Sequence, residues 1–183
     1  MDTPGASPHR PPRPAAAEAP APAGGPLWAR TALLVVPSVW LGLIAGISLI
    51  EAPLKFTAPG ITIPLGLGIG RRVFLAMNIV EIVLAVLLLV ALWRCLGRPG
   101  RQRLWALGWA ATAVLVVKVA VIRPFLNERT DAVLAGESEG GSLTHYLYVG
   151  AEVVLILVLG ALVLAAARAV VGPGTHPGAA PRS

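Results

Sequence analysis

Three ionisable side chains interrupt stretches of the sequence that are otherwise apolar. Glu81, Lys118 and Glu152 each stand inside a different apolar run of the 183-residue chain. Burying a carboxylate or an ammonium group is costly unless the group is paired, neutralised or in contact with a wet cavity. Charged residues in such runs are therefore the first candidates for a functional site.

Other polar residues are spaced so that they could join these three. Asn78 precedes Glu81 by three residues, which puts both on one face of a helix. His145, Tyr148 and Glu152 follow the i, i+3, i+7 spacing of a single helical stripe. The predicted polar pocket consists of Asn78, Glu81, Lys118, His145, Glu152, Glu51 and Arg123.

Members of this pocket also have purely structural interpretations. Lys118 is close enough to the end of its run for its ammonium to reach lipid headgroups. Glu152 could pair with Lys118 only to hold helices together, and Glu81 could make a structural hydrogen bond through Asn78. His145 is typical of a histidine at a membrane interface. Glu81 is the hardest to explain in this way, because its short side chain lies near the middle of its run.

The elements that must position these residues are long apolar helices. Hydrophobic residues make up 56% of the chain and charged residues 13%, with a mean hydropathy of +0.75, whereas soluble domains carry about 25% charged residues. Runs at 31–50, 73–93, 104–122 and 147–167 each have the roughly 20 residues that a membrane-crossing helix needs. The sequence predicts an all-α fold, a polytopic membrane protein with a four-transmembrane-helix bundle in residues 27–171.

Both ends of the chain are predicted to be disordered cytoplasmic tails. Residues 1–26 and 172–183 are rich in Pro, Ala and Gly and have no periodic apolar pattern. Nine Lys and Arg residues lie in or beside these tails and in the loop at 94–103, against five at the opposite ends of the helices. This excess predicts the cytoplasmic side. Trp28, Trp93 and Trp105 flank the same ends, at the depth that indole prefers. We expect a multi-pass protein of the bacterial inner membrane with both termini inside.

The segment between the first two runs, residues 51–72, is both apolar and charged. It contains Pro53, Pro59 and Pro64, which interrupt regular helix, and four glycines that permit close turns. We expect an interfacial or partly re-entrant loop that lies against the helices and covers the polar pocket. The alternative is a first helix that continues past Ile50 and is followed by an ordinary loop.

Few established site chemistries fit this sequence. The single cysteine, Cys95, excludes an internal disulfide and a Cys-rich metal site. A bis-histidine haem is excluded because His145 is the only histidine outside the tails, and the motifs of zinc proteases, P-loop proteins and serine hydrolases are absent. The sequence indicates no cofactor and no catalytic residues. A carboxylate–histidine metal site made from Glu81, His145 and Glu152 stays open as an alternative.

Several residues of the outer segments follow a pattern that resembles a known group of membrane proteins. It includes the strings APLKF and GLGIGRRVF, the string IRP after the third run, and a histidine that opens the fourth. The pattern, which covers roughly residues 35–165, resembles the four-helix family of transmembrane protein 205-like proteins. The matching residues are Pro53, Phe56, Gly70, Phe74, Asn78, Pro124 and His145. The resemblance implies a four-helix topology and no defined activity.

Three classes of function fit these features. The sequence favours a non-enzymatic accessory or structural membrane protein, with the lipid bilayer as its surroundings. A transporter or channel subunit that uses the outer polar pocket for a small solute or ion is the alternative, and a membrane enzyme is a third. Gly42 and Gly46 form a small-xxx-small pattern that could pack inside the bundle or make a homo-oligomer or another membrane-protein contact. The net charge of +6 is explained by the helix ends, so no nucleic-acid partner is expected.

Overall fold

The computed structural model describes residues 25–95, 102–137 and 143–171, and within these ranges every regular element is helical. Four helices are long and apolar enough to cross a membrane. The first, Leu27–Thr57, consists of α1 (Leu27–Ile44), the π-helical segment η1 (Ala45–Glu51), α2 (Ala52–Leu54) and the 3₁₀ turn η2 (Lys55–Thr57). The second is α3 (Ile63–Arg94). The third, Gln102–Leu134, joins α4 (Gln102–Val117), the π-helical segment η3 (Lys118–Ile122) and α5 (Arg123–Leu134). The fourth is α6 (Leu143–Val171).

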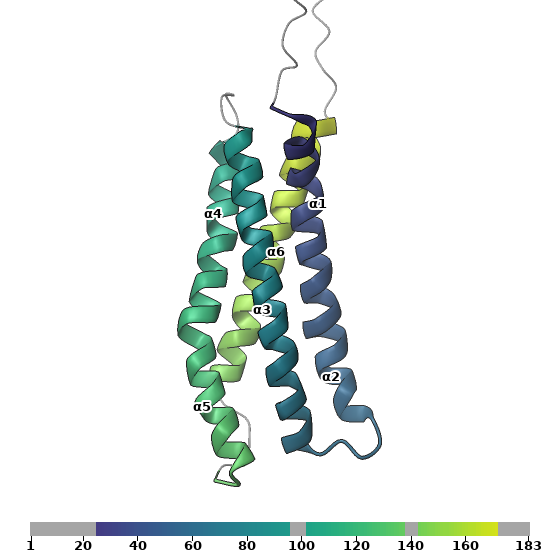
Figure 1. The fold of residues 1–183 in the computed structure, drawn as a ribbon, viewed down its shortest axis with the longest axis vertical. Coiled ribbons are helices and arrows are strands. Elements are labelled where there is room, and N and C mark those ends of the chain that lie inside the picture. The colour runs from purple at the N-terminus through teal and green to yellow at the C-terminus, as the bar shows by residue number, and fades with distance from the viewer. Residues whose placement is uncertain (1–24, 96–101, 138–142, 172–183) are drawn as a thin grey trace, which may run out of the picture.

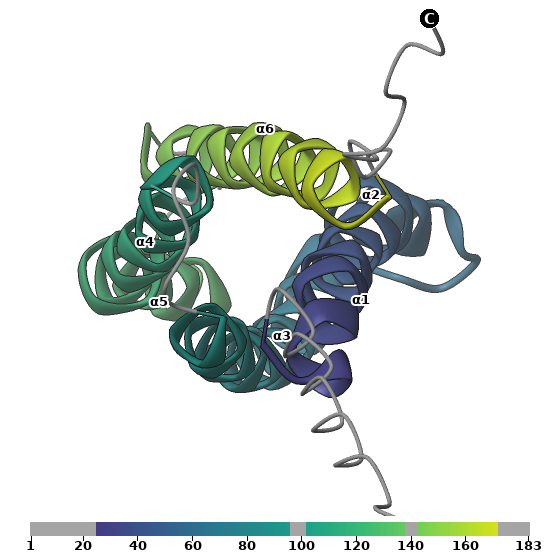
Figure 2. The same cartoon turned by 90° about the horizontal axis from the view of Figure 1, so that it is seen from above.

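The four long helices form an up-and-down bundle (Figure 1). α1 packs against α3 and α6, and α4 packs against the same two helices, so the four surround a common axis (Figure 2). The core along this axis contains Trp40, Leu88, Ala111 and Leu155. The outward faces are also apolar, as exposed side chains such as Val86 show. A bundle that is apolar on both its inner and its outer faces has the pattern of a membrane span.

The prediction of a loop over residues 51–72 is wrong. The first long helix continues past Ile50 to Thr57, and α3 begins at Ile63, so only residues 58–62 connect them. Thr62 caps α3 by accepting a hydrogen bond from the backbone N–H of Leu65 at 3.4 Å. The alternative interpretation, a first helix that continues past Ile50 and is followed by an ordinary loop, agrees with the structure.

Prolines mislead the sequence analysis here because two of them lie inside continuous helices. Pro53 lies two residues after the end of the π-helical segment η1, and Pro124 lies two residues after the end of the π-helical segment η3. A proline lacks the N–H that bonds to the previous turn, and a π-helical turn is one way to accommodate the freed backbone groups. Pro64 lies in the first turn of α3, where the missing N–H costs nothing. The third long helix consequently reaches Leu134 rather than ending near Ile122.

The predicted tails at 1–26 and 172–183 fall outside the described residues, apart from residues 25 and 26, as does most of the arginine-rich loop. Cys95, at the start of that loop, is described, and its side chain is only 2% exposed. Gly25 packs against it, since a Cβ on Gly25 would lie 3.4 Å from the Cys95 sulfur. Cys95 is therefore a packed residue at the helix end.

The Gly42–Gly46 pattern does not serve packing inside the bundle. A Cβ added to either glycine would meet no atom within 4 Å. The two glycines therefore face away from the bundle core. Of the two roles predicted for them, packing inside the bundle is excluded and a contact outside it remains. A homo-oligomer through these glycines stays a prediction.

Candidate functional site

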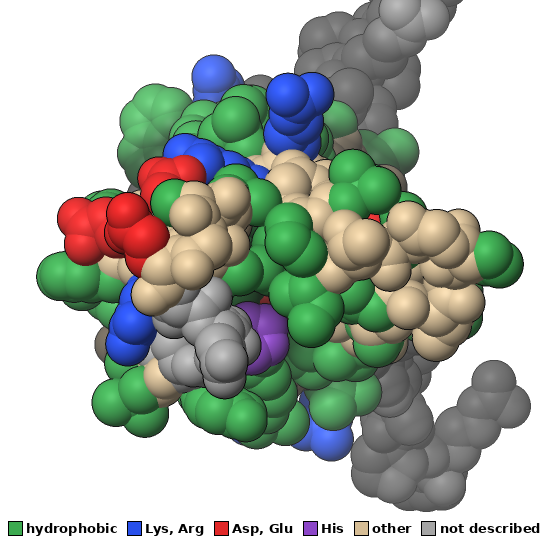
Figure 3. Space-filling view, turned by 90° about the horizontal axis from the view of Figure 1, so that it is seen from below, with side chains coloured by type: hydrophobic (Ala, Val, Ile, Leu, Met, Phe, Trp, Pro, Cys, Tyr) green, Lys and Arg blue, Asp and Glu red, His purple; other side chains and the backbone are tan. Residues whose placement is uncertain are grey.

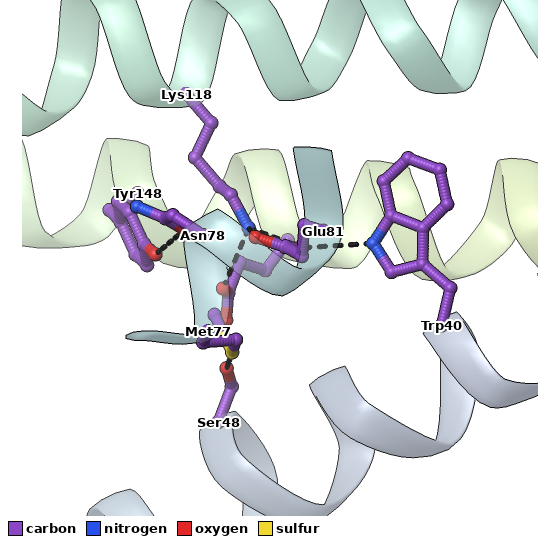
Figure 4. A network of polar contacts seen from close by, with 8 residues as sticks. Trp40, Ser48, Met77, Asn78, Glu81, Lys118 and Tyr148 are labelled. Carbon is purple, nitrogen blue, oxygen red and sulfur yellow. Dashed lines mark hydrogen bonds and ion pairs between the residues drawn. The ribbon is translucent and has the colours of Figure 1, made fainter. Parts of the chain in front are cut away.

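The three charged residues of the apolar runs meet inside the bundle. Lys118 donates hydrogen bonds from Nζ to Glu81 Oε1 at 2.8 Å and to Glu81 Oε2 at 2.7 Å. It also contacts Glu152 Oε1 at 3.2 Å (Figure 4). Glu81 and Lys118 are 0% exposed and Glu152 is 4% exposed. All three side chains therefore point inward, and Lys118 does not extend to the bundle surface.

Trp40 is a fourth member that the sequence analysis missed. Its indole Nε1 donates a hydrogen bond to Glu81 Oε1 at 3.0 Å, and the side chain is 0% exposed. Each long helix thus contributes one residue, because Trp40 lies on α1, Glu81 on α3, Lys118 at the start of η3 and Glu152 on α6. These four residues are called the buried cluster below. A buried indole N–H needs an acceptor, but the burial of Trp40 on this face of α1 is seen only in the structure.

The spacing along the helices explains why these residues can meet. At 1.5 Å per residue, Glu81 lies about 18 Å along its helix from Trp93, and Trp40 lies about 18 Å from Trp28. Lys118 lies about 20 Å from Trp105 by the same measure. Trp28, Trp93 and Trp105 lie at the same end of the bundle because the helices alternate in direction (Figure 1). Trp40, Glu81 and Lys118 are therefore at nearly the same level.

Tyr148 and Asn78 extend the cluster toward the end of the bundle formed by α2, α5 and the start of α6, called the α2–α5 end. The Tyr148 hydroxyl donates to Asn78 Oδ1 at 3.4 Å, and the Lys118 ammonium lies 5.4 Å from the centre of the Tyr148 ring. That second contact has cation–π geometry. Asn78 Nδ2 is buried and has no hydrogen-bond partner among the described residues. Phe74 supports Tyr148 from α3, edge-on at 5.5 Å between ring centres.

The charges within the buried cluster do not balance evenly. One ammonium faces two carboxylates, so full ionisation leaves one negative charge in excess. Glu81 accepts hydrogen bonds from both Lys118 and Trp40. Glu152 has one hydrogen bond in the cluster, and it is the longest of the four. Because buried carboxylates need compensation, Glu152 is the member with capacity for a proton or a cation.

A cavity of about 540 Å³ opens at the α2–α5 end and reaches Glu152 and Tyr148. Its walls come from η1, α2, η2, the start of α3, α5 and α6. Gly66 belongs to this wall, and a Cβ there would lie 2.3 Å from Phe56 Cε1, so the glycine lets the ring pack closely. Glu81 and Lys118 are not among the lining residues. The cavity therefore meets the cluster only on its Glu152 side.

The remaining predicted pocket residues lie around this cavity. Arg123 and His145 line it, and Glu51 is connected to it through Lys55, whose Nζ lies 3.5 Å from Glu51 Oε2. Figure 3 looks onto this end and shows acidic side chains gathered over α5, with basic side chains beside them. The structure thus brings Asn78 and the three charged cluster residues together, whereas Arg123 and His145 lie on the wall of the cavity that reaches Glu152, and Glu51 lies beside that cavity.

No metal centre forms from these groups. Within residues 25–95, 102–137 and 143–171, no three His, Cys, Asp or Glu side chains are arranged to hold a metal ion. In the suggested set of Glu81, His145 and Glu152, the two carboxylates share the Lys118 ammonium instead. The sequence matches no known protein-family model, and neither a curated protein nor a solved structure is significantly similar to the chain.

Proposed function

We propose that the chain is a non-enzymatic integral protein of the bacterial inner membrane, with an accessory or structural role and both termini in the cytoplasm. The observation that carries the structural role is the complete burial of the Glu81–Lys118 pair, whose neighbours come from all four long helices. The Glu81 carboxylate is paired with Lys118, accepts a further hydrogen bond from Trp40 and does not line the cavity that reaches Glu152. A carboxylate in such surroundings is suited to fixing how helices pack. The kinship with the transmembrane protein 205-like proteins stays a prediction, supported by the residues named above.

The membrane placement is supported by helix length and by the aromatic residues. Arg72 lies about 32 Å along α3 from Trp93 at 1.5 Å per residue, which is close to the thickness of the hydrocarbon layer of about 30 Å. Side chains between them that face outward include Leu75, Ile79 and Val86. With Trp28, Trp93 and Trp105 at the inner interface, the α2–α5 end is the outer end.

Single-cysteine variants test this placement. Their background is Cys95→Ala, which removes the buried native thiol so that each variant has one cysteine. Ala58→Cys, in the short connection before α3, should react with an impermeant thiol reagent in intact spheroplasts. Gln102→Cys, at the exposed start of α4, should react only after the membrane is opened. The reverse pattern would contradict the orientation, and labelling of both variants in intact spheroplasts would contradict a membrane-spanning bundle.

Solute binding or transport is a second candidate, favoured by the cavity that reaches Glu152. A carboxylate with a single hydrogen bond in the cluster, at the inner end of a cavity that opens outward, can bind a cation or a polar solute. Phe56, Phe74 and Leu126 give this cavity a largely apolar wall. The structural role requires no access from the outside, whereas this candidate does.

Access to the cavity is measured with Ser48→Cys, again in the Cys95→Ala background. Ser48 lines the cavity, so its thiol should react with an impermeant methanethiosulfonate reagent from outside if water fills the cavity. Ser38→Cys is the matched control, because Ser38 is exposed on the outward face of the same helix and would face lipid. Reaction at Ser48→Cys alone supports the cavity as a binding site. Equal inertness of both thiols would leave the structural role and remove the second candidate.

A further inference from the structure

A second and more open cavity lies on the side of the bundle, between α3 and α5. It has a volume of about 1020 Å³ and is called the side groove below. Its polar lining consists of Arg71, Arg72, Arg123 and Asn127, and its apolar lining includes Leu65 and Leu75. Among the residues that the structure describes, no acidic side chain lines it. The side groove therefore combines three guanidinium groups with apolar walls.

Two of these guanidinium groups have no counterion in the described part of the chain. Arg71 forms an ion pair with Asp131 of α5. Arg72 and Arg123 make neither an ion pair nor a hydrogen bond with any described residue. Guanidinium groups favour phosphate because their N–H donors match its oxygens in pairs. The side groove is thus complementary in charge to a phosphate group.

The position of the side groove favours one source of phosphate, the headgroup of a lipid. In the proposed membrane placement, Arg72 lies about 32 Å from the inner tryptophan Trp93 along α3, at the level of the outer headgroups. Below it on α3, Leu75, Ile79 and Ile82 are exposed to the surroundings of the bundle. An acyl chain can follow this apolar face while its headgroup meets the arginines.

We propose that the side groove binds the headgroup phosphate of an anionic phospholipid of the outer leaflet. Arg72 and Arg123 contact the phosphate, Asn127 supplies a further donor or acceptor, and the lipid tail follows the outward face of α3. A zwitterionic lipid fits less well, because its own cation would meet the same guanidinium groups. This inference rests on the proposed membrane insertion and not on the buried cluster, although Arg123 also lines the cavity that reaches Glu152.

Lipid binding can be measured on the purified full chain in detergent by native mass spectrometry and by thermal stability with added lipid. Phosphatidylglycerol should remain bound and raise the melting temperature, and phosphatidylcholine should do so much less. In Arg72→Gln/Arg123→Gln, phosphatidylglycerol binding should be about 25-fold weaker, since each arginine near an anionic headgroup contributes about a factor of 5. Arg129→Gln is the matched control, because Arg129 is exposed on α5 and does not line the side groove.

The outcomes separate this inference from the proposals on which it depends. Equal phosphatidylglycerol binding by the double variant and the wild type would overturn it, provided that both melt at the same temperature without lipid. A shift produced equally by inorganic phosphate would show an anion site and not a lipid site. Failure of membrane insertion would appear separately, in the cysteine labelling of Ala58→Cys and Gln102→Cys.

Discussion

Lys118→Ala should lower the free energy of unfolding in detergent by about 3–5 kcal/mol, because removing one partner leaves buried charge without compensation. Here the loss would leave Glu81 and Glu152 inside the bundle with no cation between them. Thermal or denaturant unfolding of the purified protein measures this change. Arg129→Ala is the control, since an exposed side chain with no ion pair to a described residue should change the free energy by about 0.5 kcal/mol or less.

Glu81→Gln should be milder than Lys118→Ala, at about 1.5–3 kcal/mol. The amide oxygen can still accept a hydrogen bond from Trp40, and Lys118 keeps Glu152 as its counterion. Equal stability of Lys118→Ala and the wild type would mean that the ammonium adds nothing to helix packing. The structural role proposed for the buried cluster would then be lost.

Trp40→Ala should cost about 3–5 kcal/mol, because it removes a fully buried aromatic side chain and leaves a cavity in the core. Trp40→Phe retains most of this volume and loses only the hydrogen bond to Glu81, so we expect about 1–2 kcal/mol. The difference between the two variants separates packing from hydrogen bonding, and both are measured by unfolding in the same detergent.

Trp109→Ala is the matched control for this pair of variants. Trp109 is 57% exposed on the outward face of α4. Its loss should change stability by much less than the loss of Trp40, although it stacks on Trp105 with ring centres 6.4 Å apart. If Trp40→Ala were as stable as Trp109→Ala, the indole of Trp40 would not be part of the core that joins α1 to α3.

The number of long helices and the inward direction of the charges could be predicted from the sequence, because both follow from the cost of burial in an apolar medium. A run of about 20 apolar residues predicts one long helix almost regardless of its neighbours. Inside an apolar bundle, Glu81, Lys118 and Glu152 each need a partner of opposite charge. Lys118 is that partner for both glutamates. Such reasoning uses only composition and order along the chain.

Helix ends and neutral partners could not be predicted in the same way. Pro53 and Pro124 suggest helix ends, yet the π-helical segments next to them let both helices continue. Trp40 could not be distinguished by its sequence position from an ordinary apolar residue, because its role depends on which face of α1 meets Glu81. Helix rotation and local π-helical geometry are properties of the packed bundle and leave little trace in the order of residues.

The most direct test of the account is a double-mutant cycle between Lys118 and Glu81. The free energies of unfolding of wild type, Lys118→Ala, Glu81→Gln and the double variant are measured in one detergent. If the buried pair holds α3 to the third long helix, the double variant should be less destabilised than the two single changes added together, with a coupling of about 1–3 kcal/mol. Additive costs, within about 0.5 kcal/mol, would contradict the account.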